Sequence, residues 1–286
     1  MSSFLKIKWK DRKRKEMKKK NGYQVDVFPR NRQIIVESIS ASKFFNHVTG
    51  ITDADVTKSL QIFENYRKKT GEQLSFTAWF MRCVAKAASE YPEIRTFRWK
   101  KWKSVIFNDV DIKCMIERMI NNRRIPIHYI FRKVDKKSFE KLHRELRDVQ
   151  AKLEEKRAEE KKIKEKQRSL LKLPIFFRKK FIWPTIIKNP FKHKEHLGII
   201  GVSALGMFGK RMPGWVVPKT MHQTQFTIGS IVRKPVETKT GVKFKDFLNF
   251  SVTINHDIVD GGPAVDFVKR VAQLLKEGFE LEKFAV

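Results

Sequence analysis

Apolar residues recur three and four positions apart in three long stretches, the spacing of an amphipathic helix. Ser75 and Asp135 precede the first two stretches and are residue types favoured at helix N-caps. Pro263 suits the first turn of the third helix, and Gly278 suits its C-terminal cap. A shorter helix is expected in 30–45. The three long helices are predicted at 76–91, 135–153 and 263–277.

Other stretches alternate apolar and polar residues or are rich in β-branched residues, which indicates strands. Helices early, in the middle and late around a set of strands predict an α+β fold with a mixed sheet. We find no internal repeat and no flexible linker, so one domain is expected. The predicted strands lie at 46–57, 104–117 with a turn at 108–109, 124–134, 197–206, 225–236 and 244–256.

The distribution of charge adds two basic segments to the predicted single domain. The 286 residues include 41% hydrophobic ones, enough for a sizeable core, but the net charge is +31. Residues 1–32 and 161–194 supply 20 of these charges. We therefore expect a basic N-terminal tail at 1–29 and a domain at 30–286 that carries a basic, aromatic insertion at about 154–196. Such segments favour anionic partners.

The basic segment 161–194 interleaves aromatic residues with lysines and arginines around Phe176 and Lys180. This pattern is typical of a segment that meets anionic lipid or an acidic partner. The alternative is a solvated helix followed by a loop docked on the body, because three prolines interrupt any long helix. Nucleic acid is the less favoured partner of this segment.

Two cysteines, Cys83 and Cys114, lie far apart among apolar neighbours, which predicts buried thiols in a reducing compartment. No stretch has the length of a signal peptide core or of a membrane span, so a cytoplasmic protein is expected, attached to a membrane if 161–194 binds lipid. His47 and His222 are interpreted as structural. No cluster has ligand spacing, and no metal is expected.

The segment "HDIVDG", His256 to Gly261, matches the HxxxDG signature of chloramphenicol acetyltransferase and of the catalytic domain of 2-oxoacid dehydrogenase dihydrolipoyl acyltransferases. Three further segments, "RKVDKKSFEKL", "VSALGMFG" and "IGSIVRKPV", resemble segments of the dihydrolipoyl acyltransferases in the same order. The resemblance spans roughly residues 30 to 280. It implies a chloramphenicol-acetyltransferase-like two-layer sandwich and a homotrimer.

The resemblance also implies a chemistry, the transfer of an acyl group between CoA and an acceptor thiol, hydroxyl or amine. His256 takes the place of the general base, a task that suits an imidazole because it accepts protons near neutral pH. Ser203 takes the place of the hydroxyl that stabilises the oxyanion. Asp260 is expected to pair with an N-terminal arginine, Arg30 or Arg32. Gly261 is expected to keep the turn tight.

The sequence departs from the family in two respects. It contains no lipoyl attachment motif, so a role in a 2-oxoacid dehydrogenase complex is not expected. The insertion at about 154–196 and the segment "KRMPGWVVPKTMH" are unlike the usual catalytic core, so we expect a different substrate. A non-catalytic trimeric scaffold that binds lipid, nucleic acid or a protein complex through its basic segments is the alternative function.

Overall fold

The structure is a computed structural model that describes residues 19–20, 23–24, 28–120, 123–151, 169–170, 172–205, 214–239 and 241–285. Within these ranges, the side chains of 19–20, 24, 30–31 and 117–127 lie outside the description. Most of the basic tail and about the first third of the predicted insertion therefore lie outside the described residues.

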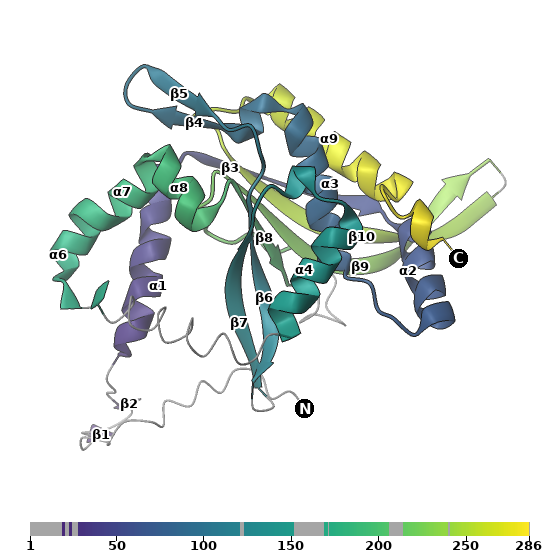
Figure 1. Ribbon diagram of the computed structural model, residues 1–286, viewed down its shortest axis with the longest axis horizontal. Coiled ribbons are helices and arrows are strands. Elements are labelled where there is room, and N and C mark those ends of the chain that lie inside the picture. Colours follow the sequence, from purple (N-terminus) through teal and green to yellow (C-terminus); the bar gives the residue numbers. More distant parts are fainter. Residues whose placement is uncertain are drawn as a thin grey trace.

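One large sheet organises the molecule (Figure 1). β8 runs parallel to both of its neighbours, and every other pair is antiparallel, which confirms the predicted mixed sheet. In order across the sheet, the six strands are β3 (His47–Asp55), β10 (Gly241–Asn255), β9 (Thr224–Thr238), β8 (Ile200–Ala204), β6 (Ile112–Ile120) and β7 (Arg123–Phe131).

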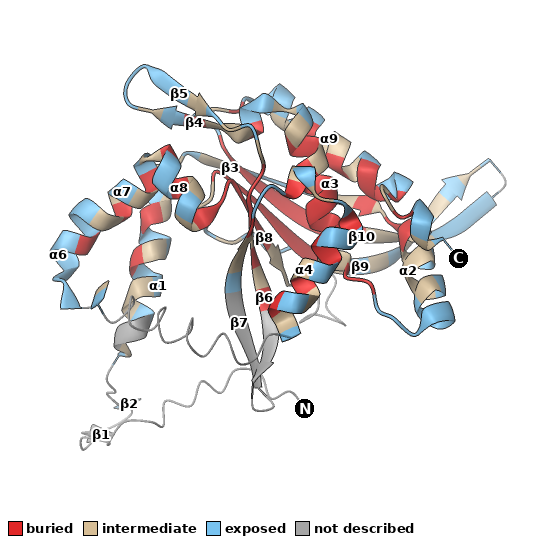
Figure 2. Cartoon of the chain, in the orientation of Figure 1, coloured by how far each residue is buried: buried red, intermediate tan, exposed pale blue. Residues whose placement is uncertain are grey.

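Helices cover one face of this sheet and bury the apolar side chains of its strands (Figure 2). On β10, Val252 and Ile254 face these helices, and Thr253 between them faces the other way. This arrangement of helices on one side of a mixed sheet confirms the predicted α+β class and its two layers. The covering helices are α2 (Thr57–Thr70), α3 (Phe76–Glu90), α4 (Phe139–Ala151) and α9 (Gly261–Glu277).

A second group of helices lies beside the sheet, next to a small hairpin (Figure 1). None of the helices in the described part of the chain is long and apolar enough to cross a membrane. The group consists of α1 (Arg30–Ser40), α6 (Ile175–Phe177), the π-helix η4 (Arg178–Ile182), α7 (Trp183–Lys188) and α8 (Pro190–Leu197), and the hairpin of β4 (Thr96–Trp99) and β5 (Lys103–Ile106). The short elements are β1 (Lys19–Lys20), β2 (Tyr23–Gln24), η1 (Ala41–Phe44), η2 (Pro92–Arg95), η3 (Val134–Lys136) and η5 (Glu282–Phe284).

The helix ends test the predicted capping residues. The Ser75 hydroxyl accepts a hydrogen bond from the Ala78 backbone N–H, and Gly278 adopts a left-handed conformation after α9, so both predictions are confirmed. The prediction for Asp135 is wrong because α4 begins later, at Phe139. Asp135 Oδ1 instead accepts a hydrogen bond from the Val110 backbone N–H at 2.8 Å, and it thereby ties two loops together.

Candidate active site

His256 lies directly after β10, and two asparagines fix its position. The His256 backbone N–H donates to the Asn46 carbonyl at 2.8 Å. Asn255 Oδ1 accepts from the backbone N–H groups of Asn46, at 3.2 Å, and Asp257, at 3.3 Å. The Asn46 side chain in turn donates to Asp257 Oδ1 at 2.7 Å. The turn is thus anchored to the start of β3, and the imidazole is left exposed.

The exposed imidazole borders an apolar groove of about 520 Å³ between the edge strand β3, β10 and the first half of α9. Its walls are mostly aliphatic, and Lys269 also lines it. A groove lined by a histidine offers space for an acceptor or an acyl chain next to a proton acceptor. The groove is lined by His256, Val48, Thr49, Gly50, Ile51, Thr52, Val252, Ile254, Val259, Gly261, Ala264, Val265, Val268, Lys269 and Ala272.

Asp260 is exposed, and its Oδ1 lies 4.0 Å from His256 Nδ1, beyond hydrogen-bond distance. Among the described side chains no arginine pairs with Asp260. Arg32 is exposed, and the side chain of Arg30 lies outside the described residues. The pairing of Asp260 with one of these two arginines therefore stays a prediction.

The expected role of Gly261 in a tight turn is corrected by the structure. The turn is made by 256–258, and Gly261 is already the first residue of α9. Its backbone has no positive φ, and an added Cβ would meet no atom within 4 Å in the single chain. Gly261, like His256, lines the groove.

Ser203 lies near the end of β8, in the middle of the sheet, and its side chain is half-buried. Gln225 Nε2, on the neighbouring strand β9, donates to Ser203 Oγ at 3.3 Å. Because the serine oxygen accepts this bond, its own hydrogen stays available for another acceptor. The sequence does not predict a role for Gln225, because nothing in a strand sequence marks a glutamine as functional. Only the pairing of β9 with β8 brings it to Ser203.

Ser203 and His256 do not meet within one chain. Ser203 lies opposite Thr227, which lies opposite Ser251, and these side chains share the sheet face that the core helices do not cover. His256 follows five residues after Ser251 and lines the groove on the helix side. At about 3.4 Å per residue and about 4.8 Å per strand, the two backbones lie roughly 20 Å apart.

The remaining candidate ligands are structural. Cys83 and Cys114 are buried and free, as predicted, and burial raises the pKa of both thiols, that of Cys114 to about 12. His47 Nε2 lies 3.0 Å from the His222 carbonyl, so the two predicted structural histidines connect β3 to the segment before β9. Among the described residues, no group of three or more His, Cys, Asp or Glu side chains is placed to hold a metal ion.

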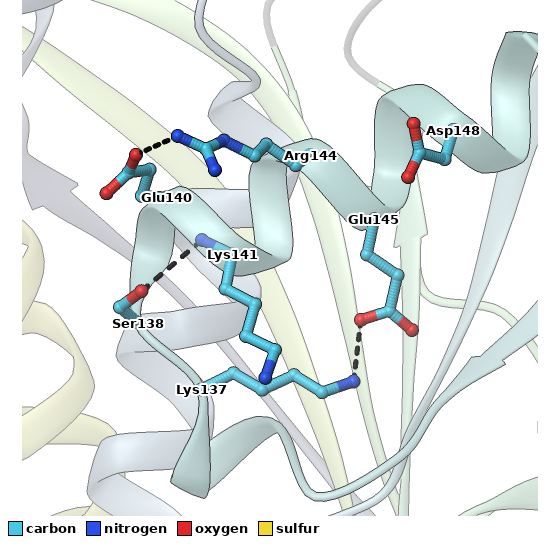
Figure 3. A pocket seen from close by; sticks show the side chains of 7 residues that line it. All are labelled: Lys137, Ser138, Glu140, Lys141, Arg144, Glu145 and Asp148. Atoms are coloured by element: carbon cyan, nitrogen blue, oxygen red, sulfur yellow. Dashed lines mark hydrogen bonds and ion pairs between the residues drawn. The ribbon is translucent and has the colours of Figure 1, made fainter.

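A second hollow, of about 550 Å³, lies along the start of α4 (Figure 3). Acids and bases on this surface pair with one another, since Lys137 Nζ contacts Glu145 Oε2 at 2.6 Å and Arg144 pairs with Glu140. We assign no chemistry to this hollow because its charges are balanced and the surface is open.

Solved structures with a similar fold come from dihydrolipoamide acetyltransferases. A probable dihydrolipoamide acetyltransferase from Listeria monocytogenes is 19% identical, with a TM-score of 0.63 over 90% of this chain and 96% of that one. The Azotobacter vinelandii enzyme and the cubic core of a pyruvate dehydrogenase multienzyme complex are each 18% identical, with TM-scores of 0.64 over 90% of this chain and 93% of theirs. A search of curated protein sequences finds no match.

The sequence itself matches the family described as "2-oxoacid dehydrogenases acyltransferase (catalytic domain)" over residues 21–173 and 194–282. The interruption, at 174–193, falls inside the predicted insertion and covers α6, η4, α7 and the start of α8. The two matched ranges make up more than half of the chain and include both Ser203 and His256. The chain therefore belongs to the family of 2-oxoacid dehydrogenase acyltransferase catalytic domains.

Proposed function

We propose that this protein transfers an acyl group between CoA and an acceptor thiol, hydroxyl or amine, with His256 as general base. The family is one of acyltransferase catalytic domains, which supports an acyl-transferring enzyme. The observation that carries the assignment is the exposed imidazole of His256, which lines an open apolar groove. The same family membership favours the enzyme over the scaffold.

In this mechanism His256 removes the proton from the acceptor while the acceptor atom attacks the acyl carbonyl carbon. The carbonyl oxygen becomes negatively charged in the tetrahedral intermediate, and the Ser203 hydroxyl donates a hydrogen bond to it. Gln225 orients that hydroxyl by donating to its oxygen. The intermediate collapses with cleavage of the original acyl bond, and the proton held by His256 passes to the leaving group.

The Azotobacter vinelandii enzyme supports these two roles. Crystallographic and enzymatic work on that protein concerns a serine, a histidine and an asparagine in its catalytic mechanism. There the serine precedes the histidine by 52 positions, and the asparagine follows it by four. Here Ser203 precedes His256 by 53 positions, and Asp260 follows it by four.

A homotrimer is part of the proposal, because two chains are needed to bring the serine to the histidine. The edge strand β3 exposes Val48 and Ile51 beside the apolar groove, a surface that a second copy would cover. A cubic core, the assembly of one of the similar structures, contains threefold axes. In such a ring each groove faces the sheet of the next chain.

Free-thiol release from acyl-CoA tests this function. Purified protein is incubated with acyl-CoA of several chain lengths and candidate acceptors, and released CoA is titrated with a thiol reagent. We expect release by the wild type, loss of release in His256→Ala, and an unchanged oligomeric mass by light scattering. His196→Ala, on α8, is the matched control and should retain activity. Acyl transfer that survives in His256→Ala would remove this residue as the base.

A further inference from the structure

The helices that interrupt the family match are held against α1 by a buried ion pair. Arg178 Nε and Nη2 donate to the two carboxylate oxygens of Glu37 at 2.9 and 2.7 Å, and both side chains are buried. Trp183 Nε1 lies 3.3 Å from the same carboxylate. Trp183 and Ile187 also form a small apolar cluster with Ala41. These contacts fix which side of 175–188 faces away from the body.

The side that faces away is apolar. Phe176, Phe177 and Phe181 are 63%, 52% and 51% exposed. Their ring centroids lie 6.1 Å apart for the first pair and 5.7 Å apart for Phe177 and Phe181, so the three rings form one patch. We call it the phenylalanine patch, and Figure 2 shows α6 exposed at the edge of the molecule. A contiguous exposed apolar patch marks an interaction site more often than chance exposure does.

Lysines accompany the patch without acidic partners. Lys180 Nζ lies 5.2 Å from the centroid of the Phe176 ring and 5.7 Å from that of Phe181, and Lys179 is exposed next to it. Among the described side chains, no carboxylate pairs with Lys179 or Lys180. Residues 172–194 contain seven lysines and arginines and no acid, but Arg178, Lys192 and Lys194 pair with Glu37, Glu195 and Asp109. At the patch itself, Lys179 and Lys180 therefore add positive charge to the three exposed rings.

The hairpin of β4 and β5 presents a further exposed aromatic residue on the same side of the molecule as the phenylalanine patch. The hairpin β4–β5 packs on α8 through Trp99, whose ring centroid lies 5.5 Å from that of Phe191. At the tip of this hairpin Trp102 is 85% exposed, with Lys101 Nζ 5.0 Å from its ring. Figure 1 shows the hairpin next to α8, which continues into α7 and α6 along one side of the molecule. We call the phenylalanine patch and this tip together the basic–aromatic edge.

We propose that the basic–aromatic edge docks on an anionic membrane surface. The rings enter the boundary between headgroups and acyl chains, and the lysines remain at the level of the lipid phosphates. A second copy of this chain is a poor occupant, because it would bring its own lysines against these lysines. A soluble polyanion would bind the lysines but leave the three rings in water. The proposal is independent of acyl transfer.

A fluorophore at the patch tests whether the rings leave water. Cys83 and Cys114 are fully buried, so a cysteine introduced at position 177 or 102 is the reactive thiol. Phe177→Cys and Trp102→Cys are labelled with a polarity-sensitive dye and mixed with vesicles of phosphatidylcholine, with or without phosphatidylserine. We expect a blue shift at both positions with phosphatidylserine vesicles only. Phe244→Cys is the control.

Phe244 is matched to the patch in chemistry and differs in place. It is 59% exposed, and Arg233 lies over its ring at 5.7 Å, so it too combines an aromatic ring with a cation. It lies on the hairpin of β9 and β10, at the opposite end of the molecule from α6 in Figure 1. Its label should not shift when vesicles are added.

The second measurement removes the rings and keeps every charge. In vesicle flotation, the variant Phe176→Ser/Phe177→Ser/Phe181→Ser should lose at least about tenfold in apparent affinity for phosphatidylserine vesicles, because the apolar part of the attachment is gone. Its residual binding should vanish at high salt, whereas part of the wild-type binding should persist. The matched variant Ile231→Ser/Val242→Ser/Phe244→Ser, which changes exposed apolar residues of the other hairpin, should bind like the wild type.

Three results would overturn the proposal. The first is no shift at positions 177 and 102 with phosphatidylserine vesicles, or an equal shift at position 244. The second is the same shift with soluble RNA or heparin in place of vesicles, which would assign the edge to a polyanion. The third is a lower oligomeric mass of the triple serine variant, which would assign the patch to contacts between copies of the chain.

Discussion

At the scale of single residues, the pair of Ser203 and Gln225 is a sharp test of the proposed site. Gln225→Leu removes the group that orients the serine hydroxyl but leaves the hydroxyl itself. We expect kcat to fall less than in Ser203→Ala, for which the loss of one oxyanion donor predicts about 100- to 1000-fold. Steady-state kinetics with acyl-CoA measures both variants.

The double variant of Ser203 and Gln225 is the control, because it shows whether the kcat losses of the two single variants are independent. If Gln225 acts through Ser203, the double variant Ser203→Ala/Gln225→Leu should be no slower than Ser203→Ala alone. Multiplication of the two losses would contradict a positioning role for Gln225.

His193 gives the fold a dependence on acidic pH. It is fully buried between the rings of Phe45 and Phe97, and burial, with the nearby charge of Lys113, lowers its pKa to about 3. The unfolded chain therefore binds the extra proton between about pH 6.5 and pH 3, and the free energy of unfolding should fall as the pH falls through this window. One such group contributes a slope of at most about 1.4 kcal/mol per pH unit.

Urea denaturation at several pH values measures this slope. His193→Phe, which keeps a ring but cannot titrate, should have a smaller slope between pH 6.5 and pH 4 than the wild type. His196→Phe, on the same helix but not buried, should keep the wild-type slope. Equal slopes in all three proteins would show that His193 does not set this dependence.

At the scale of elements, the ion pair of Glu37 and Arg178 holds the added helices to α1. Arg178→Met leaves a buried carboxylate without its partner, which should cost about 3–5 kcal/mol. Glu37→Leu/Arg178→Met removes both charges and should recover most of that loss. Hydrogen exchange of 175–188 reports the local effect, and urea denaturation reports the global one.

The matched control is the exposed pair of Arg144 and Glu140 on α4. Arg144→Met should cost no more than about 1 kcal/mol, because water solvates the remaining carboxylate. We attribute the loss of stability in Arg178→Met to the buried Glu37 carboxylate that it leaves without a partner. If Glu37→Leu/Arg178→Met is as unstable as Arg178→Met, this explanation is wrong.

Local patterns predicted most elements of the fold, because each depends on residues a few positions apart. The Ser75 cap, the Gly278 cap and the strands of the last third of the chain are of this kind. Asp135 was misassigned because its partner, Val110, lies 25 positions away. The partner of Arg178 lies 141 positions away, so no local pattern reveals it.

In the candidate site, too, some residues are predicted from local sequence motifs and others only from contacts between distant parts of the chain. His256 and Ser203 were found through motifs that resemble a family, together with the order of those motifs. Asn46 and Gln225, which fix their surroundings, carry no motif, and only the strand register brings them to the site. The opposite orientation of Ser203 and His256 also follows from register and not from spacing along the sequence.

At the scale of the whole molecule, Ser203 and His256 lie on opposite sides of the sheet, so we expect oligomers that mix two inactive variants to regain activity. We expect His256→Ala and Ser203→Ala chains each to be impaired, but the proposed trimer, when it contains both variants, has an interface where an intact histidine meets an intact serine. Every trimer that contains both variants has such a pair at one of its three interfaces, so the isolated mixed trimers should regain up to about a third of wild-type activity.

Two different affinity tags isolate the mixed oligomers for this assay. The control is a co-expression of His256→Ala with His256→Ala carrying the second tag, which should regain nothing. Mixed oligomers no more active than Ser203→Ala alone would mean that the site does not combine these residues from neighbouring chains.

The unpaired edge of β3 also affects how newly folded copies of the chain assemble. Before subunits meet, each newly folded copy presents a strand with exposed Val48 and Ile51 beside an open apolar groove. Such an edge can pair with any unprotected strand, including one from an incompletely folded chain. Slow association should thus convert nascent protein into insoluble material, and yield on refolding should depend on how promptly the copies find one another.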